Sequence, residues 1–562
     1  MKTLIIGGVA GGASAAARLR RLDENAEIIL LERGKFISYA NCGLPYYIGG
    51  EITDKSDLTL QTPQSFYERF RIDVRTENEA IAINTQQKTV TVLDKSDNKT
   101  YNESYDKLIL SPGAEPIRPN FDGIDDARIF TLRSIPDTFK IKEYINNTQA
   151  KTAVVVGGGY IGVEMAENLA NTGLKVTVVE LANHVIAPLD FDMACDVHHY
   201  LRSKGIALRL NTGVKAFASG KKLEVILDND SIYADIVILA IGVRPDTKLA
   251  KEAGLDCDAK GSILVNEYMQ TSNENVYAVG DAVKTVNFVS GQMGYIPLAG
   301  PANKQGRIAA DNICNMKSTY KGTQGSAVLK LFDMTVATTG LNEAAALAAN
   351  MDFDKVYTFS ASHATYYPNA SNMSVKILFQ KTNGRIIGAQ IIGFDGVDKR
   401  CDVLATAIRG KMNVQEITEL ELCYAPPFSS AKDPVNMAGY VAENVMNGNM
   451  RQYFWQDINK LQERTDIIMI DVRTSAEYAR GHIDKAINIP LDNLRENFEK
   501  LDKSKEIYVN CQSGLRSYIA CRILTQNGYK CYNLAGGYRL YESATRDIEF
   551  DVTPKHPCGI KI

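Results

Sequence analysis

The chain has 562 residues, 45% hydrophobic and 23% charged, and its 63 basic and 66 acidic side chains leave a net charge of −3. This composition is typical of globular proteins, and about 150 residues per domain predicts roughly four domains. There is no basic excess for nucleic acid or an anionic membrane, and no stretch reaches the roughly 18 apolar residues of a membrane helix. Ten cysteines are too few for a disulfide framework, so we expect reduced thiols in a cytoplasmic protein.

Two segments repeat the pattern of a strand, a glycine cluster, a helix and a second strand. The first combines the apolar run 3–6, the glycines of 7–12, a helix to about Leu22 and the run 27–32. The second combines the corresponding segments 153–156, 157–162, a helix to about Asn171 and 175–180. In such units the glycine turn binds a pyrophosphate and an acid ending the second strand binds a ribose. We therefore predict an α/β protein with two Rossmann-like dinucleotide-binding domains.

The two glycine loops are not identical. The second satisfies the GxGxxG pattern, whereas the first departs from it at the middle position. The phosphate-binding and ribose-binding positions are Gly7, Val9, Gly12 and Glu32 in the first unit, and Gly157, Gly159, Gly162 and Glu180 in the second. Because its carboxylate repels a ribose 2′-phosphate, Glu180 favours NADH, although the nearby His184 softens this preference and leaves NADPH possible.

The chain beyond the second unit lacks phosphate-binding glycines. Residues 326–445 show strand patterns, such as the run 374–379, followed by helical ones, which indicates an α+β scaffold or dimerisation domain. The segment 447–449 (NGN) is typical of a linker, and the run 467–471 begins another small α/β unit.

Two further segments carry a family resemblance. The segments 271–282 (TSNENVYAVGDA) and 105–114 (YDKLILSPGA) resemble flavin-binding segments of the two-dinucleotide flavoprotein reductases. The resemblance implies an FAD domain in 1–112 and 245–325, an NAD(P)H domain in 113–244, and a dimerisation domain in 326–445. The FAD-binding residues it implies are Gly7, Val9, Ala10, Gly12, Glu32, Arg33, Asn41, Ser111, Pro112, Gly113, Gly280, Asp281, Pro297, Leu298 and Ala299. Those for NAD(P)H are Gly157, Gly159, Tyr160, Ile161, Gly162, Glu180 and Gly242.

The nonapeptide 38–46 (SYANCGLPY) contains one cysteine, Cys42, and the next follows only at Cys195. Relatives similar to glutathione reductase carry a cysteine pair at this place. The pattern instead resembles the single-cysteine branch, which comprises NADH peroxidase and oxidase, CoA-disulfide reductase and NADH-dependent persulfide reductase. If Cys42 opens a helix, the helix dipole stabilises its thiolate. The competing interpretation is a small buried hydrophobic residue.

Features around the first glycine loop favour a sulfur substrate. Peroxidases and oxidases of this branch carry a histidine where this chain has Ala10. In CoA-disulfide reductases arginines on the first helix meet the CoA phosphates, and Arg18 and Arg21 share one helix face here. An ordinary solvated basic face is the alternative. The substrate residues that the resemblance implies are Ser14, Arg18, Arg21, Ser38, Asn41, Arg71, Asn303 and Asn436.

Family members also contribute tyrosines from the partner subunit of a homodimer, where a phenol can protonate a departing thiolate. The matching segments are 363–368, with Tyr366 and Tyr367, and 423–429, with Tyr424. If the second family tyrosine belongs at the end of the Ala-Pro-Pro run, this chain has Phe428 there, and Tyr424 serves only packing.

The C-terminal part resembles a single-domain rhodanese, with a linker in 446–454 and the domain in 455–562. Its nucleophile would be Cys511, at the end of a strand and the head of a helix, where loop N–H groups and Arg516 can surround the sulfur. Four residues separate Cys511 from Arg516, one fewer than in cysteine phosphatases, which suits a sulfur atom better than a phosphate. An inactive structural rhodanese usually lacks the cysteine. The residues implied are Asp471, His482, Gln512, Ser513, Gly514, Leu515 and Arg516.

The sequence thus predicts an FAD-dependent, NAD(P)H-driven reductase of CoA persulfide, CoA polysulfide or CoA disulfide. Cys42 is the expected redox cysteine, able to hold CoA as a mixed disulfide, and Cys511 handles sulfane sulfur. The alternatives are an NADH oxidase or peroxidase, or a sulfur carrier or redox sensor with slow turnover. The other cysteines are expected in cores, with Cys558 idle or a mobile resolving thiol. No metal site is expected, since His198 and His199 lack spaced partners.

Overall fold

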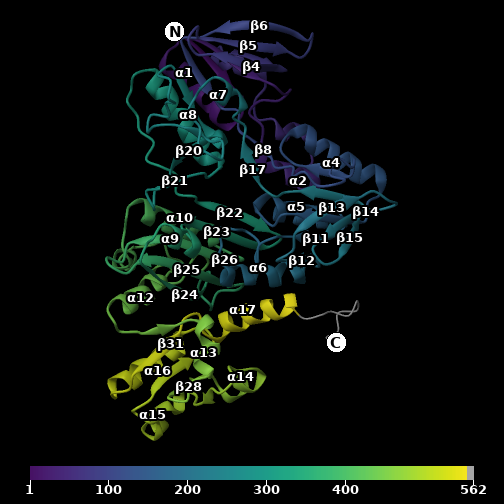
Figure 1. Ribbon diagram of the computed structural model, residues 1–562. Helices are drawn as coiled ribbons and strands as arrows, with labels where there is room; N and C mark the ends of the chain where they lie inside the picture. Colours follow the sequence, from purple (N-terminus) through teal and green to yellow (C-terminus); the bar gives the residue numbers. More distant parts are fainter. Residues whose placement is uncertain (553–562) are drawn as a thin grey trace. The chain divides into compact units, whose positions relative to one another are not determined.

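The computed structural model describes the backbone of residues 1–552 and the side chains of residues 1–547 (Figure 1), so Cys558 lies outside the described residues. The described chain forms two compact units. The first consists of Met1–Leu181 and Gly205–Gly325, and the second of Ala182–Lys204 with the chain from Ser326 onward. Among the described helices, none combines the length and apolar character needed to cross a bilayer.

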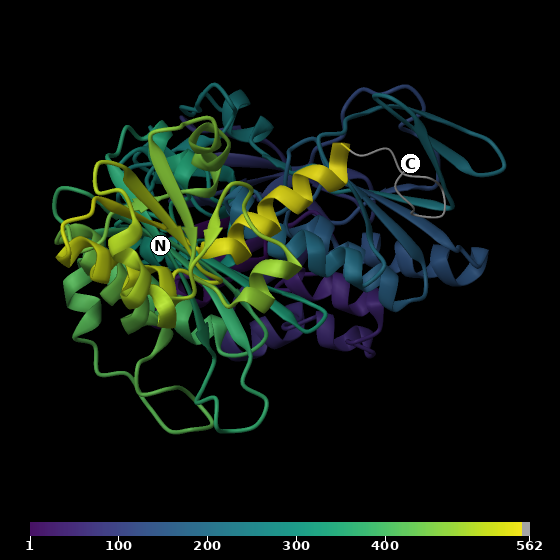
Figure 2. The same ribbon diagram turned by 90° about the horizontal axis from the view of Figure 1, so that it is seen from below.

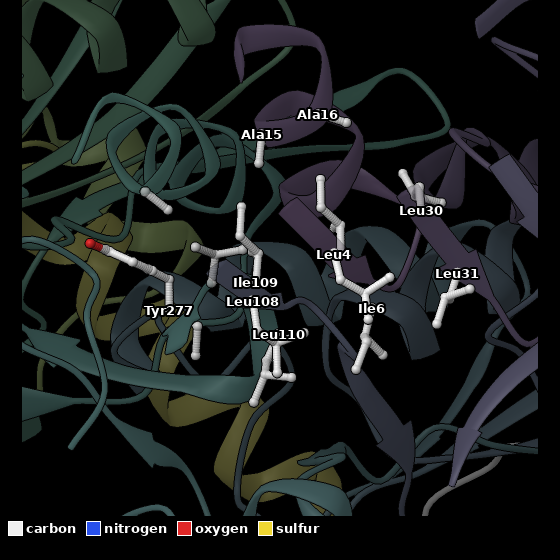
Figure 3. Packing of buried hydrophobic residues seen from close by; sticks show 14 of the residues in the cluster. Leu4, Ile6, Ala15, Ala16, Leu30, Leu31, Leu108, Ile109, Leu110 and Tyr277 are labelled. Atoms are coloured by element: carbon white, nitrogen blue, oxygen red, sulfur yellow. The ribbon is translucent and has the colours of Figure 1, made fainter. Parts of the chain in front are cut away.

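The first unit contains a parallel five-stranded sheet of order β19-β7-β1-β2-β3. Its strands are β1 (Lys2–Ile6), β2 (Glu27–Glu32), β3 (Asp73–Thr76), β7 (Lys107–Leu110) and β19 (Val276–Ala278). The helix α1 (Ala10–Leu22) joins β1 to β2, which confirms the first predicted unit. Figure 3 shows Ala15 and Ala16 of α1 over the apolar side chains of this sheet. Small alanines let the helix approach the strands closely.

A second parallel sheet in the same unit has the order β12-β11-β10-β16-β9. Its strands are β9 (Ile129–Thr131), β10 (Thr152–Val156), β11 (Lys175–Val179), β12 (Ala207–Arg209) and β16 (Ile236–Leu239). The helix α5 (Tyr160–Asn171) joins β10 to β11, which confirms the second predicted unit. In each sheet one strand, β1 or β10, is therefore followed by a glycine turn that leads into the N-terminus of a helix, as dinucleotide-binding folds require.

Shorter elements complete the first unit. Its helices are α2 (Leu44–Gly49), α3 (Pro63–Phe70), α4 (Ile135–Thr148), α7 (Lys248–Glu252) and α8 (Ala299–Ile313). Its small sheets consist of β4 (Asn78–Asn84), β5 (Thr89–Asp94) and β6 (Lys99–Ser104); β8 (Ala114–Pro116) and β17 (Val243–Pro245); β13 (Val214–Ala218), β14 (Leu223–Leu227) and β15 (Ser231–Ala234); and β18 (Ile263–Leu264), β20 (Val283–Val286) and β21 (Met293–Gly294).

The second unit contains an antiparallel sheet of order β22-β23-β26-β25-β24. Its strands are β22 (Ala327–Leu331), β23 (Met334–Gly340), β24 (Phe353–Ala361), β25 (Asn372–Gln380) and β26 (Ile386–Gly393), and the helices of this part are α6 (Phe191–Ser203), α9 (Glu343–Ala348), α10 (Val397–Arg409), α11 (Val414–Thr418) and α12 (Pro434–Met446). The predicted strand at 374–379 lies within β25. Lys376 is fully buried there and pairs with Asp190, Asp192 and Glu343.

A parallel sheet of order β27-β31-β30-β28-β29 follows in the same unit. Its strands are β27 (Gln452–Tyr453), β28 (Ile467–Asp471), β29 (Ile487–Asn488), β30 (Glu506–Asn510) and β31 (Cys531–Leu534), with the helices α13 (Ile458–Gln462), α14 (Ser475–Arg480), α15 (Leu494–Asn497), α16 (Leu515–Gln526) and α17 (Gly537–Val552). This confirms the small α/β unit predicted to begin with the run 467–471.

The last helix, α17, packs on α6 within the second unit. Figure 2 shows α17 as one long helix that runs away from the sheet before it. The fully buried carboxylate of Asp547 accepts a hydrogen bond from Nδ1 of the buried His198 at 2.7 Å and pairs with Arg202. Nε2 of His198 accepts the N–H of Val185 at 3.1 Å, and burial lowers the pKa of the imidazole. His198 is therefore a neutral donor that fixes α17 to α6.

Candidate active site

A cavity of about 830 Å³ opens in the first unit at the carboxyl ends of β1 and β7. Its lining includes most of the expected FAD residues, namely Gly7, Val9, Ala10, Glu32, Arg33, Asn41, Ser111, Pro112, Gly113, Gly280 and Asp281. Gly12 lies beneath the loop, where any Cβ would collide with the carbonyl of Gly7. Leu298 caps α8, Ala299 begins it and Pro297 precedes the cap, and none of these three residues is part of the lining.

The cavity has the chemistry of a dinucleotide site. Gly7 has a φ of 97°, and a Cβ there would collide with the carbonyl of Ser111, so the turn needs glycine. The carboxylate of Glu32 accepts the N–H groups of Gly8 and Gly34 at 3.0 and 2.8 Å, which holds the acid at the loop. Arg133 pairs with Asp281 at 3.1 Å in the lining. The tight glycine turn, the fixed acid and a cavity of this volume together fit FAD.

The second glycine loop repeats this construction. Glu180 accepts the N–H of Gly158 at 2.6 Å, and a Cβ at Gly162 would collide with the carbonyl of Gly157. At Gly159, in contrast, a Cβ would meet nothing within 4 Å. Gly159 therefore leaves room for a ligand rather than for protein, which is the role of the second glycine in such loops. Tyr160 and Ile161 begin α5, and Gly242 follows β16 with a φ of 107°.

Cys42 belongs to the first unit and lies in a short 3-10 turn, Asn41–Gly43, directly before α2. The cysteine is exposed to solvent. Its preceding residue, Asn41, lines the cavity and has a buried side-chain oxygen without a hydrogen-bond partner among the described residues. Desolvation raises the pKa of the Cys42 thiol, the carboxylates of Glu164 and Asp281 raise it further, and Arg133 opposes them. α2, the helix expected to stabilise the thiolate through its dipole, has only six residues.

Some of the residues expected to bind CoA have hydrogen-bond or ion-pair partners within the first unit, and others are exposed. Ser14 donates its hydroxyl to Asn303 at 2.8 Å, and Arg18 pairs with Asp311 at 2.7 Å. Arg18 is thus ion-paired within the first unit, whereas Arg21 is exposed, and their role towards CoA stays a prediction. Ser38 and Arg71 have positive φ angles of 45° and 49°; Ser38 is half-buried and Arg71 is exposed.

Asn436 is placed elsewhere, in the second unit. It is 7% exposed, and its amide donates to the carbonyls of Ile417 and Leu420, both at 3.0 Å. A buried amide that joins α12 to the loop after α11 is a packing residue, so the structure corrects its assignment to the substrate site.

The expected partner-subunit tyrosines cluster on the surface of the second unit. The hydroxyl groups of Tyr366 and Tyr424 lie 2.9 Å apart in a hydrogen bond, and these residues are 75% and 49% exposed. Tyr367 is also exposed, and its ring makes an edge contact with His363. Phe428, where a second tyrosine was considered, is 70% exposed. Tyr424 is therefore joined to Tyr366 rather than buried in packing.

Cys511 follows β30 and precedes α16, as the sequence predicts, and it is fully buried. Its Sγ accepts the N–H of Gly514 at 3.1 Å and the hydroxyl of Ser517 at 3.2 Å. Gly514 has a φ of 100°, which lets the loop turn its N–H towards the sulfur. Hydrogen bonds from such a loop stabilise a thiolate. Ser517, one turn into α16, was not expected in the site.

Arg516 does not surround the sulfur as expected. Its guanidinium makes two hydrogen bonds to Glu477, at 2.7 and 2.8 Å, and holds the pKa of that carboxyl low, at about 2. Asp471 is buried and accepts Arg473, which also reaches Gln512 at 3.3 Å. The ring of His482 stacks on Tyr478 with centroids 3.8 Å apart. The remaining loop positions, Ser513 and Leu515, lie at the outer side, with Leu515 59% exposed.

The described cysteines are all free thiols. Cys195, expected in a core, is buried, and it lies near His198 and Asp547 in a group with the size of a metal site. Asp547 is already paired with Arg202, so a cation would compete with a guanidinium there. Cys195 donates its thiol to the carbonyl of Phe191 at 3.1 Å, which agrees with a packing role.

Comparison with known proteins decides the family. A model described as pyridine nucleotide-disulphide oxidoreductase matches residues 1–306, which is more than half of the chain. The chain belongs to this family. The dimerisation domain of the same family matches residues 326–434, and a rhodanese-like domain matches residues 454–544. Membership in this oxidoreductase family implies FAD and a nicotinamide cofactor, for which the two glycine loops are suited.

Individual relatives cover most or all of the chain. Coenzyme A disulfide reductase from Staphylococcus haemolyticus is 37% identical over 447 residues, which are 79% of this chain and 100% of the relative. The structure of reduced Bacillus anthracis CoADR-RHD is 49% identical with a TM-score of 0.96, over 97% of this chain and 98% of that one. A NAD-dependent persulfide reductase from A. fulgidus is 38% identical with a TM-score of 0.90, over 96% and 100%.

Proposed function

We propose that this chain is an FAD-dependent, NADH-driven reductase of CoA disulfide or of CoA persulfide and polysulfide. The observation that carries the proposal is the exposed Cys42, a lone thiol that follows a lining residue of the FAD cavity. The similarity to a CoA disulfide reductase and a persulfide reductase supports the substrate class. Glu180 at the second glycine loop supports NADH, with NADPH as a weaker donor.

The chemistry at Cys42 is an exchange of sulfur–sulfur bonds. The Cys42 thiolate attacks a sulfur of the substrate, so a bond to Cys42 forms, the substrate S–S bond breaks, and thiolate or hydrosulfide leaves. FAD, when bound, would supply two electrons from NADH. Cleavage of the bond between the Cys42 sulfur and the substrate sulfur would then return the Cys42 thiolate and release the bound group as a second thiolate or as hydrosulfide. Ala10, in the place of a peroxidase histidine, supports this sulfur chemistry over peroxide chemistry.

Other parts of the chain have proposed roles around this exchange. The substrate CoA would be met by Ser14, Asn41, Arg21, Arg71 and Asn303. In a homodimer, the Tyr366–Tyr424 pair of one protomer would protonate the thiolate that leaves the partner's site. We assign FAD binding to 1–112 and 245–325, nucleotide binding to 113–244, dimerisation to 326–445, a linker to 446–454 and rhodanese activity to 455–562. The free thiols support a cytoplasmic enzyme.

The rhodanese part would supply or accept sulfane sulfur. Cys511 is the proposed carrier, because two hydrogen-bond donors meet its sulfur in a closed loop. A persulfide on Cys511 would form by attack of its thiolate on a sulfane donor, with the donor's remaining group leaving.

The test is anaerobic NADH oxidation with CoA disulfide, CoA persulfide and polysulfide side by side, with released sulfide and thiol measured. The wild type should consume NADH with at least one of these, and Cys42→Ser should lose this turnover by more than about 1000-fold. Cys257→Ser, a partly buried thiol of the first unit, is the control and should retain it. Unchanged turnover in Cys42→Ser would refute the mechanism. If NADH is consumed only in a parallel aerobic assay, the chain would instead be assigned as an oxidase.

A further inference from the structure

A buried arginine of the second unit joins the two loops that carry the exposed tyrosines. The first tyrosine loop, residues 362–371, lies between β24 and β25, and the second tyrosine loop, residues 419–433, lies between α11 and α12. Arg400 of α10 is 1% exposed. Its guanidinium donates to the carbonyl of Ser362 at 2.9 Å and to the carbonyl of Phe428 at 3.3 Å. A single side chain thus bonds to the backbone of both loops.

The guanidinium of Arg400 has further partners on its other sides. Asp433, the N-cap of α12, is buried and pairs with it at 3.0 Å. The carboxylate of Asp433 also accepts the hydroxyl of Ser429 at 2.7 Å, and the oxygen of that hydroxyl accepts the guanidinium at 3.0 Å. Gly396 accepts Nη1 through its carbonyl at 3.2 Å, and a Cβ at this glycine would collide with Nη1. An arginine with this many charge-assisted hydrogen bonds is held in one geometry.

Two further contacts close the base of the first tyrosine loop. The N–H of Ala364 donates to the carbonyl of Ser429, in the second tyrosine loop, at 3.0 Å. His363 is 5% exposed, and its Nε2 lies 3.1 Å from the carbonyl oxygen of Pro368. Because a carbonyl only accepts, Nε2 carries the hydrogen of this bond. The bond closes residues 363–368 into a turn that contains Tyr366.

The tips of the two loops, in contrast, are open to solvent in a single protomer. Tyr366 and Tyr424 are both exposed, and their hydroxyl groups share the hydrogen bond of 2.9 Å. Water competes for a hydrogen bond in so exposed a place, so this bond contributes little to the relative position of the loops. Their register is therefore set at the buried base, where Arg400 bonds to both.

We propose that Arg400 is a positioning residue for the proton donor of the reductase site. It keeps the two tyrosine loops in the register in which Tyr366 and Tyr424 share their hydrogen bond and act as one acid. The proposal deepens the proposed function and rests on it, because the phenol pair is assigned there to the leaving thiolate. Loss of the guanidinium should therefore slow the departure of a basic thiolate and spare the attack by Cys42.

The step moves one electron pair and one proton. The Cys42 thiolate attacks a disulfide RSSR, a bond from Cys42 to one sulfur forms, and the S–S bond breaks with both of its electrons on the departing RS⁻. One phenol of the pair gives its proton to RS⁻, and the other donates its O–H to the phenolate that results. Solvent then returns the proton. A weakly basic thiolate leaves without a proton, so its departure does not depend on the phenol pair.

The test compares two leaving groups that yield the same adduct. The anaerobic holoenzyme, reduced with one equivalent of NADH, is mixed with CoA disulfide or with the mixed disulfide of CoA and an aromatic thiol. The CoA adduct of Cys42 is quantified by mass spectrometry after acid quenching. Arg400→Lys keeps the charge opposite Asp433 but loses the planar fork. Its rate constant should fall about tenfold or more with CoA disulfide and stay within about twofold with the aromatic mixed disulfide. Tyr366→Phe should give the same pattern.

Ser429→Ala is a milder second variant. It removes one partner of the guanidinium, so the rate with CoA disulfide alone should fall about threefold, and it decides the question if Arg400→Lys does not fold. Arg409→Lys, the same substitution at an exposed position of α10, is the matched control and should keep both wild-type rates. Equal losses with both leaving groups would overturn the positioning role, as would unchanged rates.

A measurement without turnover separates this proposal from the proposed function. Amide hydrogen exchange of peptides covering residues 362–371 and 423–430 should quicken about fivefold or more in Arg400→Lys, because the loops lose their common support. The same peptides should exchange at the wild-type rate in Arg409→Lys. Unchanged exchange in Arg400→Lys would overturn the positioning role. Failure of the wild type to form the CoA adduct would instead refute the proposed function and leave the exchange result interpretable.

Discussion

Cys42 and Cys511 both precede a helix, yet their surroundings differ in almost every respect. Cys42 is exposed and lies in a 3-10 turn before a six-residue helix, and desolvation together with the charges of Glu164 and Asp281 raises the pKa of its thiol. Cys511 is fully buried, precedes a twelve-residue helix, and receives hydrogen bonds from Gly514 and Ser517.

The difference shows how the two sulfur chemistries are supported. At Cys511 the protein itself provides the donors, so the loop is ready for a sulfur atom before any ligand arrives. At Cys42 the polypeptide raises the pKa of the thiol instead of stabilising the thiolate. Its exposure leaves the thiol accessible to a large substrate. Cys42 is therefore open to a large substrate, whereas the surroundings of Cys511 are a closed loop with its hydrogen-bond donors already in place.

The largest expected effect separates the two sites. Cys511→Ser should lose sulfur transfer from thiosulfate to cyanide by more than about 1000-fold, because the nucleophile is gone. The same variant should keep NADH oxidation with CoA disulfide within about twofold, because that reaction needs only Cys42 in our assignment. Both rates are measured on the same preparation. Loss of both activities in Cys511→Ser would show that NADH oxidation with CoA disulfide also requires Cys511.

A smaller effect is expected from the hydroxyl at Cys511. Ser517→Ala removes one of two donors to the sulfur, and a hydrogen bond to a charged group contributes about 1.5 kcal/mol or more, so sulfur transfer should fall about tenfold. Ser504→Ala, on an exposed turn of the same domain, is the control. A rate equal to wild type in Ser517→Ala would mean that the loop N–H groups suffice.

The smallest effect concerns the ion pair beside this loop. Arg516 lowers the pKa of Glu477 to about 2, so the pair contributes stability above the ordinary carboxyl pKa and loses it as the pH falls towards 2. Glu477→Gln should therefore have a lower Tm than wild type near pH 7, and the difference should shrink below about pH 5. Scanning calorimetry across this range, with exposed Glu499→Gln as control, measures it. A pH-independent difference would contradict the ion-pair origin.

The sequence predicted those features that local patterns encode. Both βαβ units follow from apolar runs that stop at glycines, and the sites of Gly7 and Gly157 follow from the same pattern. Cys511 at the head of a helix was equally visible. The ion-pair partners of the arginines could not be predicted from the sequence. Glu477 lies 39 residues from Arg516, and Asp311 lies 293 residues from Arg18. Such pairs depend on which helices the fold brings together.

Glu164 shows a second limit of sequence reasoning. Its position, two residues after Gly162 on α5, is readable from the sequence, but its raised pKa comes from burial and from the carboxyl of Glu167. A local motif does not encode the burial of a side chain. Asn436 shows the opposite case. The family resemblance assigned this polar residue to the substrate site, whereas in the fold its buried amide donates hydrogen bonds to the backbone carbonyls of Ile417 and Leu420.

The anchor of α17 has a consequence for how this fusion is divided. The rhodanese-like match ends at residue 544, and Asp547, which pairs with His198 and Arg202, comes three residues later. Truncation before the rhodanese-like domain would remove the carboxylate that accepts the Nδ1 hydrogen bond of His198 and pairs with Arg202, so the remaining part of the chain should lose stability. Transplanting only the matched domain would omit the anchor. The joint thus extends beyond the matched rhodanese-like segment, and gene fusions that preserve it must include Asp547.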